Sequence, residues 1–237
     1  MEHQKKRRKQ PKKKIRLQRF IALNSDYSRR KAEELIQSGI VKINSTKAEL
    51  GQSIDPQKDK IYINGKLIKP IKKRITLMLN KPAGYVTTKK DPHANKTVMD
   101  LIPYKDVFPV GRLDKDTEGL LLLTNDGDLA YKLTHPKFEH EKEYFVELKF
   151  EITPDQIKKL EKGVVIDGKK TAPCKITKHK KNKLNITLHE GRKRQIKRMF
   201  EKLGNKVIYL YRLRIGKLKL GSLKKGSHKL INSENIC

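Results

Sequence analysis

The stretch 111–130, GRLDKDTEGLLLLTNDGDLA, constrains the fold of this chain more than any other part of its sequence. Its first half is a turn-rich loop that holds Asp114, Asp116 and Glu118 among glycine, threonine and lysine residues. Its second half opens with four consecutive leucines, residues 120–123, and closes at an Asn-Asp-Gly turn signal. A short apolar run between turn signals is typical of a strand that is buried on both faces. We therefore expect a loop with three carboxylates to be held rigidly against the protein core, where an acid can be positioned for catalysis.

The same carboxylates have two alternative explanations, a calcium site and ordinary turns. A calcium loop that began at Asp114 would need a bidentate glutamate at its twelfth position, but that position is Asn125. It would also need flanking helices, whereas residues 120–124 have the pattern of a strand. No metal site is therefore expected. A structural role, in which Asp114 or Asp116 closes an Asx-turn or caps a helix, stays open on the sequence alone.

Basic residues greatly outnumber acidic ones. The 237 residues include 57 Lys and Arg against 26 Asp and Glu, which gives a formal net charge of +31. Such an excess favours a polyanionic partner, and no segment approaches the roughly 18 apolar residues of a membrane span. We therefore expect the chain to bind nucleic acid and not a membrane.

Two further absences indicate a cytoplasmic protein. The N-terminus lacks the apolar segment of a secretory signal. The two cysteines, Cys174 and Cys237, lack the CxxC spacing of a zinc site and do not form a disulfide framework. A reducing compartment fits both observations.

Composition divides the chain into four segments. Residues 1–14 hold eight Lys or Arg residues and nothing to bury, so we expect a disordered basic arm. This arm can contact RNA phosphates, although an ordinary solvated tail would have the same composition. Residues 15–68 have the pattern of a compact α/β unit, residues 69–74 that of a linker, and residues 75–237 that of a larger domain.

The spacing of apolar residues predicts an α+β fold with a mixed or mainly antiparallel sheet, because strands are many and rarely alternate with helices. Residues 141–152 alternate, which predicts that Tyr144, Val146, Leu148 and Phe150 share a buried face. In the helix predicted at 192–204, the apolar stripe leaves Lys197 beside it and not within it. Further strands are predicted at 40–44, 61–68, 75–82, 85–88, 120–124, 174–188 and 206–221, and further helices at 15–24, 28–38, 98–102, 128–135 and 154–163.

The segment GRLDKDTEGLLLLTNDG resembles the signature of the ribosomal RNA pseudouridine synthases that are grouped with RsuA and RluB. Further motifs of that family follow the same order along the chain: NKPAGYVTT (80–88), EKEYFVEL (141–148) and EGRKRQIKRMF (190–200). The resemblance implies that the chain breaks the C1′–N1 bond of a uridine and rejoins the same base through C5. No atom is gained or lost in this reaction, so no cofactor is expected. The aspartate of GRLD, which the family uses as its nucleophile, is Asp114 here.

The resemblance also implies two partners for Asp114. In the family, a tyrosine of the strand motif stacks on the uracil and takes part in proton transfer, and the matching residue is Tyr144. Without the resemblance, an inward-facing tyrosine would be read as part of the sheet core. A basic residue in the family pairs with the nucleophile from the end of an RQ[IV][RK] run, which places Lys197 in that role. Lysine carries a compact charge and cannot bind a carboxylate through two parallel hydrogen bonds as an arginine guanidinium does. Arg194 is therefore the reserve candidate for this pair.

RNA-binding residues are expected in both domains. The segment SRRKAEELIQSGIVKIN resembles an S4 RNA-binding domain, and its matching positions imply a phosphate-facing group of Arg29, Arg30, Lys31 and Lys42. The alternative for these residues is an ordinary basic surface. In the larger domain, the residues expected to contact the RNA backbone are Lys81, Arg112, Arg192, Arg194 and Arg198.

These features predict an enzyme that converts a uridine of ribosomal RNA, in the 23S molecule, to pseudouridine. The expected partner is ribosomal RNA or a ribosomal precursor particle, and we expect a monomer. The NKPAGYVTTKKD segment and the basic extension favour the large-subunit members of the family over the 16S-directed ones. The alternatives are a 16S-directed member, a non-catalytic RNA-binding or ribosome-assembly factor and, less favoured, a metal-dependent nuclease.

Overall fold

The computed structural model describes residues 14–69, 74–233 and 236, and the chain divides into two compact units, Met1–Lys73 and Arg74–Cys237. Nearly all of the predicted basic arm and most of the predicted linker lie outside the described residues. Within the described ranges, the helices are all too short or too polar to cross a bilayer.

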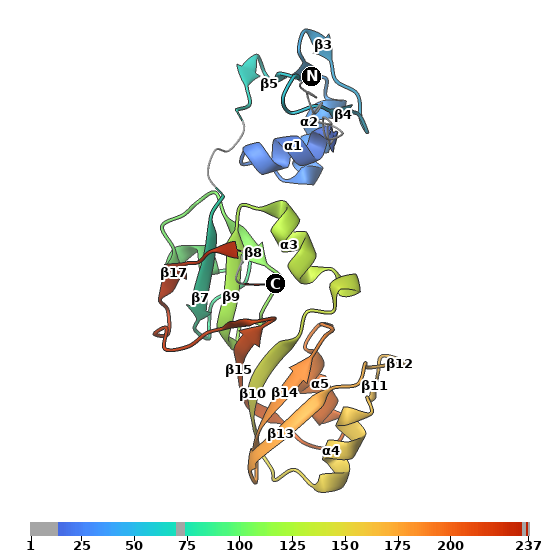
Figure 1. Ribbon diagram of the computed structural model, residues 1–237, viewed down its shortest axis with the longest axis vertical. Coiled ribbons are helices and arrows are strands. Elements are labelled where there is room, and N and C mark those ends of the chain that lie inside the picture. Colours follow the sequence, from blue (N-terminus) through green and yellow to red (C-terminus); the bar gives the residue numbers. More distant parts are fainter. Residues whose placement is uncertain (1–13, 70–73, 234–235, 237) are drawn as a thin grey trace, which may run out of the picture. The chain divides into compact units, whose positions relative to one another are not determined.

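The smaller unit packs two helices against short strands (Figure 1). The second helix begins after Ser28, whose side chain accepts a hydrogen bond from the Lys31 backbone N–H at 3.1 Å. The Asn64-Gly65 turn joins two strands with φ of 48° and 76°, as a tight hairpin requires. The helices are α1 (Leu17–Asn24) and α2 (Arg29–Gln37); the strands are β1 (Ile15–Arg16), β2 (Val41–Ile43), β3 (Thr46–Lys47), β4 (Ser53–Ile54), β5 (Ile61–Ile63) and β6 (Lys66–Leu67).

The larger unit is built on one mixed sheet with the order β13-β14-β10-β15-β9-β7-β17, to which β16 and β8 attach. All of its described strand pairs are antiparallel except β9 with β15. The predicted α+β class with a mainly antiparallel mixed sheet is therefore confirmed. The strands are β7 (Thr76–Lys81), β8 (Phe108–Val110), β9 (Glu118–Thr124), β10 (Lys142–Leu148), β11 (Val165–Ile166), β12 (Lys169–Lys170), β13 (Lys175–Lys180), β14 (Lys183–Leu188), β15 (Val207–Ile215), β16 (Leu218–Lys219) and β17 (His228–Leu230); the helices are η1 (Val98–Leu101), α3 (Gly127–Thr134), η2 (Pro136–Phe138), α4 (Pro154–Glu161) and α5 (Gln195–Glu201).

The leucine run forms β9, and every residue of this strand is buried. Leu120 and Leu122 share a core cluster with Leu129 of α3. Leu121 and Leu123 belong to a second cluster, which lies beside η1. Because successive side chains of a strand point to opposite faces, an unbroken leucine run places apolar side chains on both faces of the sheet, and both faces are covered here.

The parallel pairing of β9 with β15 depends on Gly119. Gly119 has φ of +100° and lies opposite Arg212, and a Cβ atom at this position would lie 2.4 Å from the Arg212 carbonyl oxygen. Only glycine fits this close approach of two backbones. The contact joins the carboxylate loop to the strand that lies next to β10.

Four local predictions differ from the structure. Residues 85–88 do not form a strand but make a single bridge, between Val86 and Thr97. Phe150 follows the end of β10 and is 54% exposed, so it does not share the buried face of that strand. Lys197 is buried, although the apolar stripe of its helix was expected to leave it outside. Seven strands of two or three residues were not predicted, namely β1, β3, β4, β8, β11, β12 and β17.

Candidate active site

The carboxylate loop is wrapped around the side chain of Lys81. Lys81 ends β7 and is fully buried. Its ammonium group donates to the carbonyl oxygen of Thr117 at 2.8 Å and to those of Pro82, Asp114 and Lys115 at 3.1 Å each. A buried charge is costly unless hydrogen bonds satisfy it, and here the backbone of the loop supplies them.

This burial corrects the expectation that Lys81 contacts the RNA backbone. The fully enclosed ammonium cannot reach a phosphate, because the loop that carries Asp114 covers it. Burial lowers the pKa of Lys81 to about 8, while the carboxylates of Asp116, Glu118 and Asp114 oppose this shift. Lys81 therefore stabilises the conformation of the loop through hydrogen bonds from inside the core.

The three carboxylates of the loop have different environments. Glu118 is buried and accepts hydrogen bonds from the Tyr209 hydroxyl at 2.7 Å and the Ala83 backbone at 3.2 Å; it also pairs with Lys225 at 2.7 Å. Asp116 pairs with Lys197. Among the described residues, the Asp114 carboxylate has neither an ion pair nor a hydrogen bond, and Asp114 lines a pocket. Of the three, Asp114 is the one whose carboxylate has no charged partner among the described residues and that lines the pocket.

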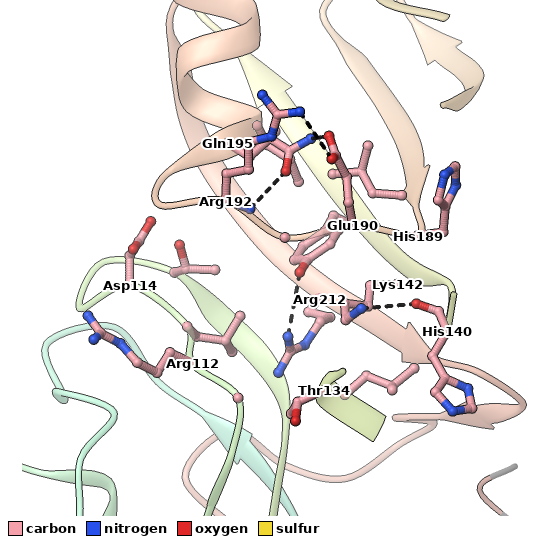
Figure 2. Close-up of a pocket in the computed structure, with 18 of the residues that line it drawn as sticks. Arg112, Asp114, Thr134, His140, Lys142, His189, Glu190, Arg192, Gln195 and Arg212 are labelled. Carbon is pink, nitrogen blue, oxygen red and sulfur yellow. Dashed lines mark hydrogen bonds and ion pairs between the residues drawn. The ribbon is translucent and has the colours of Figure 1, made fainter. Parts of the chain in front are cut away.

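The pocket has a volume of about 480 Å³ and is bounded by the loop, the end of α3, β10, β15 and the segment between β14 and α5. Figure 2 shows Asp114 and Arg112 projecting from the loop, across from Arg212 and Lys142. Cationic side chains therefore surround a carboxylate at one site. Of the predicted site residues, those that line this pocket are Arg112, Asp114, Tyr144, Arg192 and Arg194.

Tyr144 lies beside a buried arginine that the sequence analysis did not single out. Arg212 is 3% exposed, and its Nη1 lies 3.5 Å from the Tyr144 hydroxyl and its Cζ 5.9 Å from the centre of the ring (Figure 2). Its Nε donates to the Leu120 carbonyl at 2.6 Å, and its Nη2 is buried without a hydrogen-bond partner in the described structure. A buried guanidinium with a spare donor group is suited to an incoming oxygen atom of a ligand.

The predicted ion pair between Lys197 and Asp114 is not formed. Lys197 Nζ instead lies 2.5 Å from an oxygen of Asp116, two residues further along the loop. The side chain of Lys197 is 8% exposed and that of Asp116 is 61% exposed, and this pairing lowers the pKa of Asp116. Lys197 therefore reaches the correct loop but a different carboxylate. Arg194, the reserve candidate, caps α5 with φ of 53° and lines the pocket.

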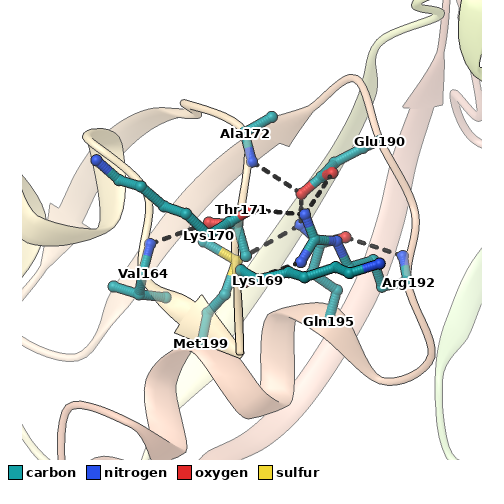
Figure 3. Close-up of polar contacts among 9 residues, drawn as sticks. All are labelled: Val164, Lys169, Lys170, Thr171, Ala172, Glu190, Arg192, Gln195 and Met199. Carbon is teal, nitrogen blue, oxygen red and sulfur yellow. Dashed lines mark hydrogen bonds and ion pairs between the residues drawn. The ribbon is translucent and has the colours of Figure 1, made fainter. Parts of the chain in front are cut away.

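Arg192 and Arg198, both predicted to contact RNA, are engaged within the protein. Arg192 donates to the carbonyl oxygens of Lys169 at 3.0 Å and Lys170 at 2.6 Å, and pairs with Glu190 at 3.3 Å (Figure 3). These contacts of Arg192 tie the segment before α5 to β12, and Glu190 also accepts from Gln195 at 2.6 Å, at the start of α5. Arg198 pairs with Asp167. These contacts give both arginines structural roles that the sequence did not indicate.

The basic residues predicted in the smaller unit are on its surface. Arg29, Arg30, Lys31 and Lys42 are all exposed. Lys31 pairs with Glu34 at 2.8 Å, one turn further along α2. The unit therefore presents cationic side chains to solvent at the start of α2 and on β2.

Lys142 is a second pocket residue that the sequence analysis missed. It begins β10, lines the pocket and donates to the His140 carbonyl at 3.0 Å. Desolvation and the neighbouring Arg212 lower the pKa of Lys142.

The sequence held a signal for Arg212 in the alternation of β15, because Arg212 follows buried Leu210 at a spacing of two. Lys142 had no comparable signal among the many lysines.

Comparisons with known proteins find two family models and several relatives that match this chain. Residues 75–202 match the family described as RNA pseudouridylate synthase, and residues 15–59 match the S4 domain. The chain is 43% identical over 207 residues to the ribosomal large subunit pseudouridine synthase B of Bacillus subtilis (strain 168), across 83% of this chain and 84% of that protein. It is 37% identical over 224 residues to the dual-specificity RNA pseudouridine synthase RluF of Escherichia coli (strain K12), across 94% and 77%. A crystal structure of a pseudouridylate synthase matches it with a TM-score of 0.70 and 34% identity, across 94% of this chain and all of that one.

The lowered pKa of Lys81 predicts how its removal changes stability with pH. Between pH 8 and pH 10.5 the unfolded chain keeps the proton on this lysine while the folded protein loses it, so the lysine favours folding more as the pH rises. The free energy of unfolding lost in Lys81→Met should therefore grow from pH 8 to pH 10, by up to about 3 kcal/mol. Chemical denaturation at several pH values measures this difference.

The control for this prediction is Lys115→Met, which removes an exposed lysine from the same loop. Its effect on the free energy of unfolding should not vary over that range. A loss for Lys81→Met that stays constant, or shrinks as the pH rises, contradicts the prediction.

Proposed function

This chain belongs to the RNA pseudouridylate synthase family, carries an S4 domain and is an isomerase, and we propose that it converts a specific uridine of 23S ribosomal RNA to pseudouridine with Asp114 as its nucleophile. The proposed role of Asp114 rests on the different surroundings of the three loop carboxylates. Glu118 and Asp116 are held by basic partners, whereas Asp114 lines the pocket. A nucleophile must be free to meet its substrate in this way.

The reaction makes no net change in the atoms of the nucleotide. The C1′–N1 bond breaks, a C1′–C5 bond forms, C5 loses its proton and N1 gains one. Asp114 can act in three ways: it can attack the sugar, remove a proton from the sugar or add to the base. Each route needs one ionised carboxylate, a nearby group that moves a proton, and a surface that holds the detached uracil.

Tyr144 and Arg212 of the pocket wall, together with Lys197, can supply these needs. We assign to Tyr144 the stacking surface and the proton transfer, because Tyr144 lines the pocket and has both an aromatic ring and a hydroxyl. Arg212 supports that assignment, since its guanidinium lies close to both parts of the tyrosine. Lys197 keeps its proposed role as the cation of the site. In the free enzyme it balances Asp116, and this leaves Asp114 open for the nucleotide.

RNA binding is divided between the two units in this proposal. The uridine must leave its stack to reach the pocket, which costs roughly a few kcal/mol. Phosphate contacts made by Arg29, Arg30 and Lys42 of the S4 unit, and by Arg112 and Arg194 at the pocket, would offset that cost. Arg192, Arg198 and Lys31 contribute less, because each already has a partner within the protein.

The choice of the large-subunit RNA is supported by the similarity to the Bacillus subtilis protein named above. The dual-specificity name of the Escherichia coli relative makes a second target the main alternative. We further propose that the enzyme acts in the cytoplasm on rRNA or a ribosomal precursor, as a monomer, and without a cofactor.

Asp114→Asn and Asp116→Asn should separate chemistry from structure. Asp114→Asn removes a carboxylate without a partner among the described residues, so product should disappear while the melting temperature stays unchanged. Asp116→Asn leaves buried Lys197 without its ion pair, which should lower the melting temperature by up to about 4 °C and preserve measurable turnover. Pseudouridine formation on saturating rRNA and thermal melts measure both effects. Substantial turnover by folded Asp114→Asn would exclude the proposed nucleophile.

The target is tested by mapping pseudouridines in the rRNA of cells that lack this protein. We expect the loss of modification at one uridine of 23S rRNA, with restoration by the wild-type chain and not by Asp114→Asn. Loss confined to 16S rRNA or to a transfer RNA would refute the proposed target while leaving the reaction class intact.

A further inference from the structure

An aromatic cluster lies on the surface next to the pocket. It consists of Tyr131, His135, Phe138 and His140, from α3, η2 and the segment that follows. Large aromatic rings are usually buried, yet Tyr131 is 47% exposed and Phe138 is 38% exposed. The cluster therefore presents apolar ring surface to solvent on a highly charged protein.

The four rings of the cluster lie close together, with Phe138 next to each of the other three. The centre of the Phe138 ring lies 6.0 Å from that of Tyr131, 6.4 Å from that of His135 and 6.3 Å from that of His140. Lys137 Nζ lies 5.4 Å from the centre of the Tyr131 ring and 4.8 Å from that of Phe138. The cluster thus combines ring faces with a cation, the combination that single-stranded nucleic acid prefers.

The cluster is continuous with the active site. His135, Pro136 and His140 line the same pocket as Asp114, and the His140 carbonyl accepts a hydrogen bond from Lys142. In Figure 2, His140 lies at the edge of the pocket, below Lys142 and away from the Asp114 loop. Desolvation and the charge of Lys142 lower the pKa of His140. The aromatic cluster therefore shares His135 and His140 with the pocket wall.

We propose that the aromatic cluster binds an unpaired base of the RNA that neighbours the target uridine, by stacking on Phe138 and Tyr131. This inference rests on the proposed RNA substrate. Extruding the uridine removes the stacking partner of its neighbour, so a base near the pocket mouth is available to a new aromatic surface. The net charge of +31 and the lysine over the rings favour a polyanion over an apolar protein segment at this surface.

The test compares variants of the cluster with a matched control elsewhere in the same unit. Phe138→Ala and Tyr131→Ala remove ring surface, and Phe138→Leu keeps apolar volume while removing the aromatic face. The control is Phe150→Ala, because Phe150 is 54% exposed, has Lys149 Nζ 5.1 Å from its ring centre and does not line the pocket. The probes are full-length 23S and 16S rRNA transcripts without modifications, assayed in single-turnover reactions over a range of RNA concentrations.

We expect the RNA concentration at half-maximal rate to rise about 5- to 100-fold for Phe138→Ala, Phe138→Leu and Tyr131→Ala, as the loss of one stacked base implies. The maximal rate should stay within about twofold of the wild type, and Phe150→Ala should behave like the wild type. Unchanged RNA dependence in both Phe138 variants would overturn the inference, and so would an equal defect in Phe150→Ala. Modification of 16S rRNA alone by the wild type would instead refute the proposed target, and the variants would then be compared on that RNA.

Discussion

The catalytic unit depends on a buried ammonium group. Lys81 is enclosed at the end of a fully buried strand, and the loop that carries Asp114 supplies three of its four carbonyl acceptors. A charge in this position would be prohibitive without these hydrogen bonds, so the loop must keep the one conformation that provides them. The position of Asp114, the proposed nucleophile, is thus fixed by a buried lysine that the loop itself covers.

A second constraint aligns the opposite wall of the pocket. Gly119 ends the loop and allows β9 to approach the backbone of Arg212 more closely than any side chain would permit. Arg212 in turn lies beside Tyr144, its neighbour on β10. The short parallel pairing of β9 with β15 therefore fixes the loop that carries Asp114 relative to Tyr144. Rigid support of this kind is what holds reacting groups in productive geometry.

Local patterns predicted the family, the mixed sheet and the segments that carry Asp114 and Tyr144, and the comparisons confirm the family. The roles of individual residues were harder to predict, because they depend on contacts between distant segments. Lys81 looks like a surface cation in the sequence, and its burial comes from a loop 33 to 36 residues away. Lys197 reaches the expected loop but pairs with Asp116, which motif position alone could not specify. The internal contacts of Arg192 likewise form only when β12 meets the segment before α5.

If Lys81 positions Asp114 without contacting RNA, its removal should impair the reaction and not RNA binding. The measurement is the single-turnover rate of pseudouridine formation by folded Lys81→Met on saturating rRNA at pH 7. The rate should fall by about 100-fold or more, because a displacement of about 1 Å in a catalytic group has that effect, while RNA affinity stays within about twofold of the wild type. A wild-type rate in the folded variant would contradict the account, since the loop would then hold Asp114 in place without its buried cation.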